Sequence, residues 1–221
     1  ILAHEIKNPL TPIQLTIDRI RNKYSDQISD ENQDSFKDNL KIINNQIKQI
    51  EQLVNEFSDF ARMPKPILIN NDLVLIIQDN ISLLKQIDTS IKFNFIKNKD
   101  KILLNSDKEQ ISRVFLNLIK NSIESIKEKD QKTTNIDKKI SIELTEDDKH
   151  IRSIIEDTGV GFKNLKNDIK DILNPYFTTK KDGTGLGLSI VNKIINDHNG
   201  TIKFNSINNG AKIELKFRFK V

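Results

Sequence analysis

Apolar residues in the first part of the chain recur with the spacing of helices that pack side by side. One run alternates steps of four and three: Ile6, Leu10, Ile13, Ile17 and Ile20. A second run with the same spacing comprises Phe36, Leu40, Ile43, Ile47, Ile50, Val54, Phe57 and Ala61. Such spacing is typical of coiled coils. Because residues 23–34 between the runs are polar, residues 1–62 are expected to form a helical hairpin.

Two helices alone would leave much of this apolar stripe in water. A four-helix bundle of two copies would bury it, so a homodimer is expected. In a monomer, the second part of the chain would have to cover the same stripe. Segment 63–67 contains Pro64 and Pro66, which do not continue a helix, and it is the expected linker to a second domain at 68–221.

The second domain mixes two periods. Helical patterns cover 72–86, 106–129 and 186–200, whereas strand patterns cover 91–97, 139–146, 150–157, 201–207 and 211–219. Ser106 or Asp107 is the expected cap of the second helix. A connection of about 25 residues, from Gly159 to Gly183, has the length of a functional lid or a disordered segment. Antiparallel strands with helices on one face predict an α+β sandwich, and the fold class is α+β.

Composition excludes several classes of site. The chain has 35 Lys and Arg against 31 Asp and Glu, and the interspersed net charge of +4 argues against a nucleic-acid partner. Without cysteine there is no disulfide or thiolate zinc site, and three scattered histidines do not form a metal cluster. No apolar run approaches the ~20 residues of a membrane span. The chain begins without Met, so we expect a fragment whose membrane segments lie in a missing N-terminal part.

Two glycine-containing stretches in the second domain suit a nucleotide. "EDTGVGF" ends a strand with Asp157, whose carboxylate can accept the adenine amine, and continues with Gly159 and Gly161; an ordinary turn is the alternative. "DGTGLGLSIV" opens a helix whose backbone amides suit phosphate, although a simple flexible loop would look similar. That second stretch contains Gly183, Thr184, Gly185, Leu186 and Gly187.

Two further stretches offer polar side chains. "NLIKNSIES" puts Asn117, Asn121 and Glu124 on one helix face, where an amide oxygen could bind Mg²⁺ or simply face water. "PYFTTKK" lies in the long connection, and its lysine could contact phosphate or only solvent. It supplies Phe177, Thr178, Thr179 and Lys180.

Together and in order, these stretches resemble the sensor histidine kinases of bacterial two-component systems. "HEIKNPL" at residue 4 is similar to their H box, "NLIKNS" to the N box, "DTGVGF" and "GTGLGL" to the glycine boxes, and "PYFTTK" to the F box. The resemblance covers essentially the whole chain. "HEIKNPLTPIQL" and "EFSDFARMP" look closest to NtrY-type nitrogen-regulation sensors.

This resemblance implies a dimerisation and histidine-phosphotransfer domain followed by a Bergerat-type ATP-binding domain. It implies ATP and Mg²⁺ as cofactors, His4 as the phosphoacceptor and Asn121 as the metal ligand, with the receiver domain of a response regulator as partner. Asn117, Asp157 and the glycine and F-box residues fall at ATP-binding positions. Many family members have a basic residue near the end of the N box, where this chain has Glu124 and Ser125. The whole protein would be an inner-membrane sensor with this kinase portion in the cytoplasm.

The first motif explains an unusual helix start. Pro9 and Pro12 each leave a carbonyl of the preceding turn without its helical donor, which favours a bend. Glu5 follows His4 directly and could act as its general base. Asn8 lies one turn further, where its amide could orient water for a phosphatase reaction. Three rivals remain: an ATPase of the same fold, a scaffold that binds no nucleotide, and a nucleic-acid binder.

Overall fold

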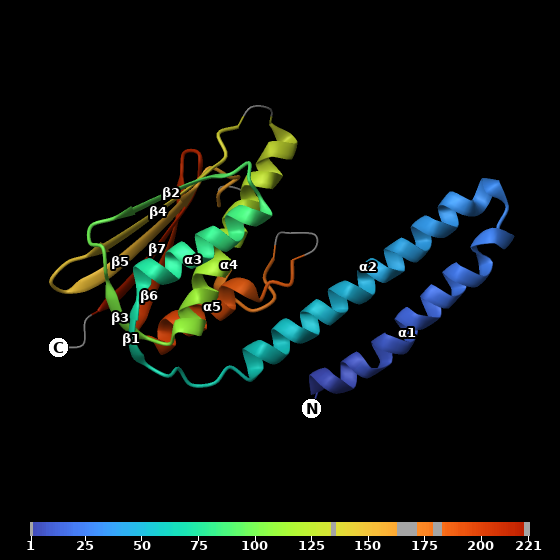
Figure 1. Ribbon diagram of the computed structural model, residues 1–221, viewed down its shortest axis with the longest axis horizontal. Coiled ribbons are helices and arrows are strands. Elements are labelled where there is room, and N and C mark those ends of the chain that lie inside the picture. Colours follow the sequence, from blue (N-terminus) through green and yellow to red (C-terminus); the bar gives the residue numbers. More distant parts are fainter. Residues whose placement is uncertain (1, 134–135, 163–171, 179–182, 219–221) are drawn as a thin grey trace. The chain divides into compact units, whose positions relative to one another are not determined.

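The computed structural model describes residues 2–133, 136–162, 172–178 and 183–218, with side chains from Asn8 onward (Figure 1). The chain divides into two compact units. One comprises Ile1–Met63 with Thr178–Leu186, and the other Pro64–Phe177 with Gly187–Val221. The two units are described separately below.

The first unit contains the predicted helical hairpin. Its elements are α1 (Leu2–Tyr24), the short 3-10 helix η1 (Ser25–Gln27) and α2 (Asp30–Ala61). Four residues of the predicted stripe form its buried core, namely Leu10, Ile17, Leu40 and Ile47. The turn is shorter than the polar segment 23–34, because α2 already begins at Asp30. Asp30 and Glu31 favour this start, since negative charge stabilises the first turn of a helix.

The hairpin leaves part of its apolar stripe exposed. Ile13, Ile43, Ile50 and Phe57 belong to the predicted stripe but remain 37–45% exposed in the single copy. These exposed residues are therefore available for further packing. Helix α1 itself continues through Pro9 and Pro12.

The second unit is built on a five-stranded sheet with the order β2-β4-β5-β7-β6. Its strands are β2 (Lys92–Lys97), β4 (Lys139–Glu146), β5 (His150–Asp157), β6 (Gly200–Ile207) and β7 (Gly210–Arg218). The bounds of β4 and β5 match the predicted ranges, and the hairpin between them is confirmed. The prediction of purely antiparallel strands is wrong at one pair, because β2 and β4 run parallel. A crossover through a helix separates these two strands in the sequence, which permits the parallel pairing.

A second, two-stranded sheet is absent from the predicted elements. It pairs β1 (Ile69–Asp72) with β3 (Leu103–Ser106) in antiparallel register. Each strand has only four residues, too few for an alternating pattern to stand out in the sequence.

Three helices cover one face of the larger sheet: α3 (Leu73–Ile87), α4 (Lys108–Lys132) and α5 (Gly187–Asp197) (Figure 1). Helix α4 contributes the largest buried set, which comprises Ile111, Val114, Phe115, Leu118, Ile119, Ile123 and Ile126. Strand β4 turns every second residue inward and buries Ile140, Ile142 and Leu144. Each fully buried side chain of this size stabilises the fold by roughly 1.5–3 kcal/mol. Helix α4 is thus fixed between the sheet and the other two helices.

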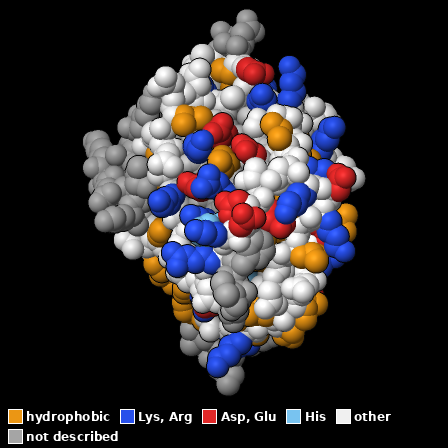
Figure 2. Space-filling model, turned by 90° about the vertical axis from the view of Figure 1, so that its left-hand side faces the viewer, with side chains coloured by type: hydrophobic (Ala, Val, Ile, Leu, Met, Phe, Trp, Pro, Cys, Tyr) orange, Lys and Arg blue, Asp and Glu red, His pale blue; other side chains and the backbone are white. Residues whose placement is uncertain are grey.

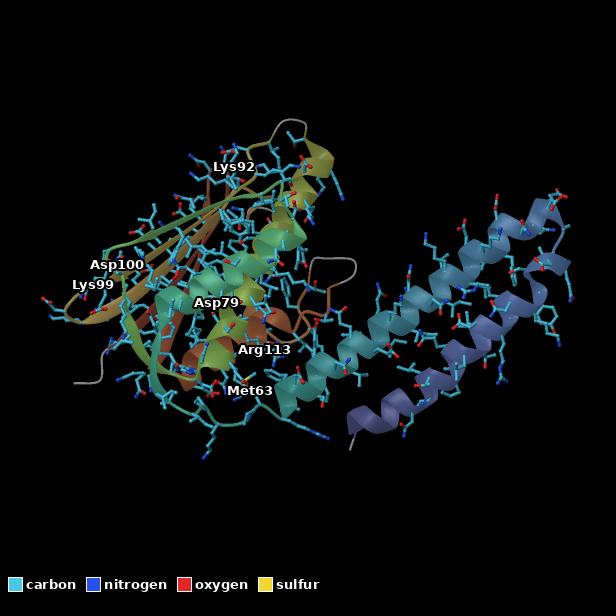
Figure 3. The ribbon with its side chains drawn as sticks, viewed as in Figure 1. Met63, Asp79, Lys92, Lys99, Asp100 and Arg113 are labelled. Atoms are coloured by element: carbon cyan, nitrogen blue, oxygen red, sulfur yellow. The ribbon has the colours of Figure 1, made fainter. Side chains whose placement is uncertain are left out.

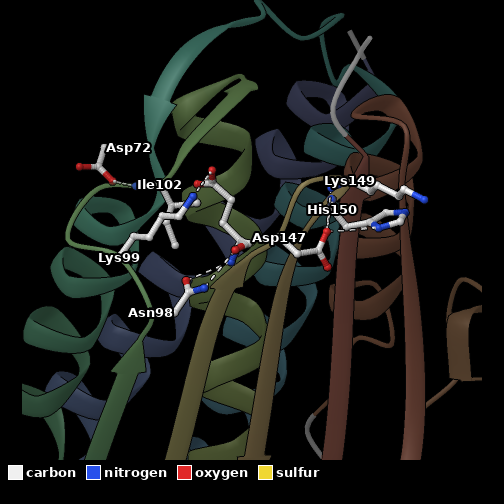
Figure 4. A network of polar contacts seen from close by, with 8 residues as sticks. Asp72, Asn98, Lys99, Ile102, Asp147, Lys149 and His150 are labelled. Atoms are coloured by element: carbon white, nitrogen blue, oxygen red, sulfur yellow. Dashed lines mark hydrogen bonds and ion pairs between the residues drawn. The ribbon is translucent and has the colours of Figure 1, made fainter.

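Polar contacts fix the strand ends furthest from the nucleotide motifs (Figure 4). The Asn98 side chain donates to the Glu146 carbonyl and accepts from the Glu146 N–H, both at 3.0 Å, and so extends the β2–β4 pairing. The Asp147 carboxylate accepts from the N–H groups of Lys149 and His150, each at 2.8 Å, and closes the β4–β5 hairpin. Figure 3 shows Lys92 at the start of β2 and Lys99 beyond its end.

Charges of both signs are mixed on the face shown in Figure 2, and neither sign forms a broad patch there. Ion pairs across neighbouring strands join Arg152 to Glu214 at 3.1 Å and Lys212 to Glu156 at 2.8 Å. Positive and negative side chains, which are interspersed along the sequence, are therefore also interspersed on this face.

The start of α4 ties three segments together through Asp107. Its carboxylate accepts from the N–H of Gln110 at 3.1 Å, as a helix cap, and from the N–H of Ile67 at 3.0 Å. Its own N–H donates to His198 Nε2 at 3.0 Å, so the proton on His198 is at Nδ1, which donates to the Ile194 carbonyl. Burial alone would raise the pKa of Asp107, but the N–H donors of Gln110, Ile67 and Glu109 outweigh it and lower that pKa.

We expect Asp107→Ala to lower the free energy of unfolding at pH 7 by about 1 kcal/mol, the usual cost of a lost helix cap. A lowered folded-state pKa means that the carboxylate stabilises the fold above the unfolded pKa, roughly 3.9. That contribution is lost as the pH falls through the folded-state pKa. Urea unfolding between pH 7 and pH 3 should show the difference from wild type shrinking with acid. Asp79→Ala, at an exposed position of α3, is the matched control, and equal midpoints for both variants at pH 7 would contradict the prediction.

Candidate nucleotide site

The predicted site is centred on Asp157, the last residue of β5. Its side chain is 4% exposed, which is unusual for a carboxylate. Its Oδ1 atom accepts from the N–H of Gly159 at 2.9 Å and from the N–H of Ala211, at the start of β7, at 3.4 Å. The turn and the neighbouring strand therefore both fix its orientation.

The electrostatics of this carboxylate are unusual. Burial raises the pKa of Asp157, and the Gly159 N–H, the Ser122 hydroxyl, the Ala211 N–H and the charge of Lys129 offset only part of that rise. The Ser122 hydroxyl is buried beside this carboxylate. A buried acceptor beside a buried hydroxyl fits a planar base that presents an amine donor and ring acceptors.

Two glycines allow the backbone to come unusually close behind this carboxylate. Gly161 has φ +67, and a Cβ there would lie 2.4 Å from the Gly210 carbonyl oxygen. Gly210 has φ +145, and a Cβ there would lie 1.8 Å from the Asp157 carbonyl oxygen. Only glycine fits such contacts. Sequence patterns missed the role of Gly210, since "NNG" indicates only a hairpin turn.

Helix α4 brings the N-box face to the start of α5. The Asn117 side-chain N–H donates to the Arg113 carbonyl at 2.9 Å, so the Oδ1 atom of Asn117 takes no part in that bond. That Oδ1 lies 3.4 Å from where a Cβ on Gly187 would stand. The structure thus brings Asn117 next to Gly187 of the second glycine box. Asn121 and Glu124 lie half-buried on the same helix.

The long connection is described only in part. Phe177 is half-buried and its N–H donates to the Asn174 carbonyl at 3.2 Å, while Thr178 is exposed. The Thr184 hydroxyl accepts from the Leu186 N–H at 3.4 Å, and Gly185 has φ +70. Gly183 is half-buried and Leu186 is fully buried. Thr179 and Lys180 lie outside the described residues.

Helix α1 contains the residues of the first motif. His4 and Glu5 lie on its backbone, but their side chains are outside the described set. Asn8 is exposed. The proposed roles of these three residues remain predictions.

No group of three or more His, Asp or Glu side chains in the described parts of the chain is arranged to hold a metal. Mg²⁺ prefers oxygen ligands and often keeps waters and substrate phosphates in its coordination sphere. One amide oxygen from the N box, together with phosphate oxygens, fits that preference better than a site made of protein ligands alone.

Comparison with known families matches both parts of the chain. Residues 1–66 match the His Kinase A (phospho-acceptor) domain. Residues 106–221 match the histidine kinase-, DNA gyrase B-, and HSP90-like ATPase family. The chain belongs to the histidine kinases.

Relatives agree with this family. A sensor histidine kinase described as NtrY-like from Rickettsia felis is 34% identical to the histidine kinase chain over 220 residues, which cover 99% of the chain and 35% of the relative. The nitrogen regulation protein NtrY of Azorhizobium caulinodans is 31% identical over 99% of the chain and 28% of that protein. The chain therefore spans about a third of the length of the relatives it matches.

Solved structures show the same fold. The histidine kinase ThkA, in complex with the response regulator protein TrrA, is 25% identical with a TM-score of 0.67, over 99% of this chain and 60% of that one. The Acinetobacter baumannii histidine kinase AdeS shares the fold at 17% identity and a TM-score of 0.63, over 99% of this chain and 98% of that one.

In the described part of the histidine kinase chain, no helix has the length and apolar character needed to cross a bilayer.

We expect Asp157→Asn to separate binding from stability. The substituted amide keeps an oxygen that can accept from Gly159 but loses the charge, so ATP affinity should fall at least about tenfold, because a hydrogen bond to a charged group contributes ~1.5–3 kcal/mol. A raised folded-state pKa means that ionised Asp157 destabilises the fold as pH rises through that pKa. The nucleotide-free variant should therefore be at least as stable as wild type at pH 7.

Calorimetric titration with ATP and thermal unfolding without nucleotide measure the two effects. Asp79→Asn, at an exposed position outside the site, is the matched control. Unchanged ATP affinity in Asp157→Asn would reduce Asp157 to a turn residue, and a large loss of stability at pH 7 would contradict the electrostatic argument.

Proposed function

We propose that this chain is the kinase core of a two-component sensor, which phosphorylates His4 with ATP and passes the phosphoryl group to an aspartate of a response regulator. The observation that carries the proposal is the buried, glycine-enclosed Asp157 in a chain that also contains the "HEIKNP" motif. The two family matches in this order support it. The complex of the similar kinase ThkA with the response regulator TrrA supports the choice of partner.

The second unit would hold the nucleotide. Asp157 would accept a hydrogen bond from the amine of adenine, beside the turn that contains Gly159 and Gly161. The backbone amides from Gly187 onward, at the start of α5, suit the phosphates. Asn121 would hold Mg²⁺, which neutralises charge on the phosphates when bound.

His4 and Glu5 would carry out the transfer. A ring nitrogen of His4 forms a bond to the γ-phosphorus while the bond to the bridging oxygen breaks and ADP leaves. Glu5 takes the proton from the imidazole ring. The transition state needs mainly alignment and charge neutralisation, so positioning accounts for most of the catalysis.

The proposed domains are 1–62 for dimerisation and phosphotransfer, 63–67 as linker and 68–221 for ATP binding. Hydrogen bonds attach Pro64 and Ile67 of the linker to the start of α4. Gln110 Nε2 donates to the Pro64 carbonyl at 3.0 Å, and the Ile67 N–H donates to Asp107. The pivot between the domains would then be short, at Arg62 and Met63, directly after α2 ends.

A homodimer would cover the exposed stripe of Ile13, Ile43, Ile50 and Phe57. Packing this stripe against its copy gives a four-helix bundle, in which such spacing buries apolar side chains. The greater length of the relatives named as sensors is compatible with a membrane-anchored parent protein whose kinase portion lies in the cytoplasm.

An ATPase of the same fold that does not transfer phosphate to histidine is the second candidate, because the ATPase family match includes such proteins. Incubation with γ-labelled ATP separates the two. Label on the protein that is labile in acid and stable in base supports the kinase, whereas free phosphate without labelled protein supports the ATPase.

We expect His4→Gln to abolish labelling and to leave ATP affinity near that of wild type. The physical reason is that the nucleotide motifs all lie after the linker, so the substitution removes the nucleophile only. Autoradiography after acid and base treatment measures labelling, and calorimetry measures affinity. Label that persists on another residue of the variant would overturn the assignment of His4.

We expect Asn8→Ala to keep autophosphorylation within a few-fold and to slow dephosphorylation of the regulator at least about tenfold, or ~1.4 kcal/mol in the barrier. Asn8 is exposed one turn after His4, where its amide can orient a water but cannot deprotonate His4. The assay follows a purified receiver domain that has taken label from the wild-type chain, with ADP and either chain added. Equal decay rates would remove Asn8 from the mechanism, and a parallel loss of both activities would indicate a disturbed helix.

A further inference from the structure

The turn that follows β5 has backbone groups that the sheet does not pair. Residues 158–161 leave the ladder, since Asp157 is the last residue of β5 and Gly161 has φ +67. Each buried N–H or C=O in such a turn needs a partner from elsewhere, or the conformation is costly. The partners of Thr158 and Val160 show what holds the turn.

Helix α4 supplies two of these partners. The Val160 N–H donates to Ser125 Oγ at 3.0 Å. Lys129 Nζ donates to the Thr158 carbonyl at 2.8 Å. Ser125 and Lys129 are four residues apart, so they lie on one face of the helix and meet the turn from the same side.

Close packing makes the first of these bonds possible. A Cβ on Gly159 would lie 2.2 Å from Ser125 Oγ and 2.7 Å from the Ser125 carbonyl carbon. Glycine at 159 therefore lets the turn approach α4 closely enough for the Ser125 hydroxyl to reach Val160. The same glycine donates to the Asp157 carboxylate, so a shift of the turn away from α4 would also move the donor to Asp157.

The other side of the turn is attached to the start of β4. The Thr158 N–H donates to the Lys139 carbonyl at 3.2 Å, and the Thr158 hydroxyl accepts from the Lys139 N–H at 3.0 Å. These bonds hold the N–H and the hydroxyl of Thr158 against β4. The Val160 N–H and the Thr158 carbonyl are instead bonded to α4, through Ser125 and Lys129 respectively.

We propose that Ser125 and Lys129 are positioning residues that hold the turn 157–161 in its nucleotide-binding conformation before ATP arrives. The inference deepens the proposed function, because it concerns the same site. Ser125 and Lys129 do not touch the reacting phosphate. They act through the backbone that orients Asp157, and they occupy the helix that also carries Asn117 and Asn121, so one rigid element aligns both ends of the nucleotide site.

The test compares Ser125→Ala and Lys129→Met with Lys129→Arg, which keeps a donor. Ser82→Ala and Lys108→Met, at exposed positions of α3 and α4 outside the N box, are the matched controls. Ser125→Ala and Lys129→Met should each bind ATP about three- to tenfold more weakly by calorimetry, the range expected for one lost hydrogen bond. Lys129→Arg should regain most of the affinity. In autophosphorylation, KM for ATP should rise and kcat should stay near wild type.

Hydrogen exchange without nucleotide supplies the readout that a general loss of stability would not give. Amides of residues 158–162 should exchange faster in Ser125→Ala and Lys129→Met, while those in the core of α4 and β4 keep the wild-type rate. Unchanged ATP affinity in both variants would overturn the proposal. So would faster exchange throughout the domain, or a Lys129→Arg variant as weak as Lys129→Met.

Failure of the proposed roles of Ser125 and Lys129 and failure of the kinase assignment give different results. If the wild-type chain binds ATP and the variants bind it equally well, only the roles of Ser125 and Lys129 fail. If the wild-type chain binds no ATP, the nucleotide site itself is wrong.

Discussion

The structure of the second unit depends on keeping one carboxylate buried at the end of β5. Asp157 is destabilising there as an ion, because burial raises its pKa more than its hydrogen bonds lower it. A charge in such a place persists when the surrounding backbone is arranged to face it. Around Asp157 that arrangement comes from the turn at Gly159 and from the start of β7 at Ala211.

The glycines follow from the same constraint. Gly161 and Gly210 bring two turns into contact behind Asp157, and Gly159 brings the first turn against α4. A side chain at any of these positions would push apart the elements that orient the carboxylate. The first glycine box therefore has a packing role around Asp157, in addition to allowing backbone to approach a ligand.

Helix α4 links this site to the rest of the domain. Its start is capped by Asp107, which also holds the linker at Ile67 and, through His198, the end of α5. Its middle is buried against the sheet, and its final turns contact the residues after Asp157. One helix thus runs from the linker contacts at Asp107 to the turn that follows Asp157.

The sequence by itself determined the hairpin, the five strands of the larger sheet, and Asp157 as a strand-ending carboxylate followed by two glycines. These features depend on local period and on motifs a few residues long, which a single sequence displays directly. Tertiary structure decided what depends on distant partners: the parallel pairing of β2 with β4, the short β1–β3 sheet, and Asp107 rather than Ser106 as the cap. It also placed Gly210 and Ser122 beside Asp157, and Ser125 beside the turn that follows Asp157. Their contacts join segments 34 or more residues apart, and no local pattern records which distant backbone will approach a given glycine or serine.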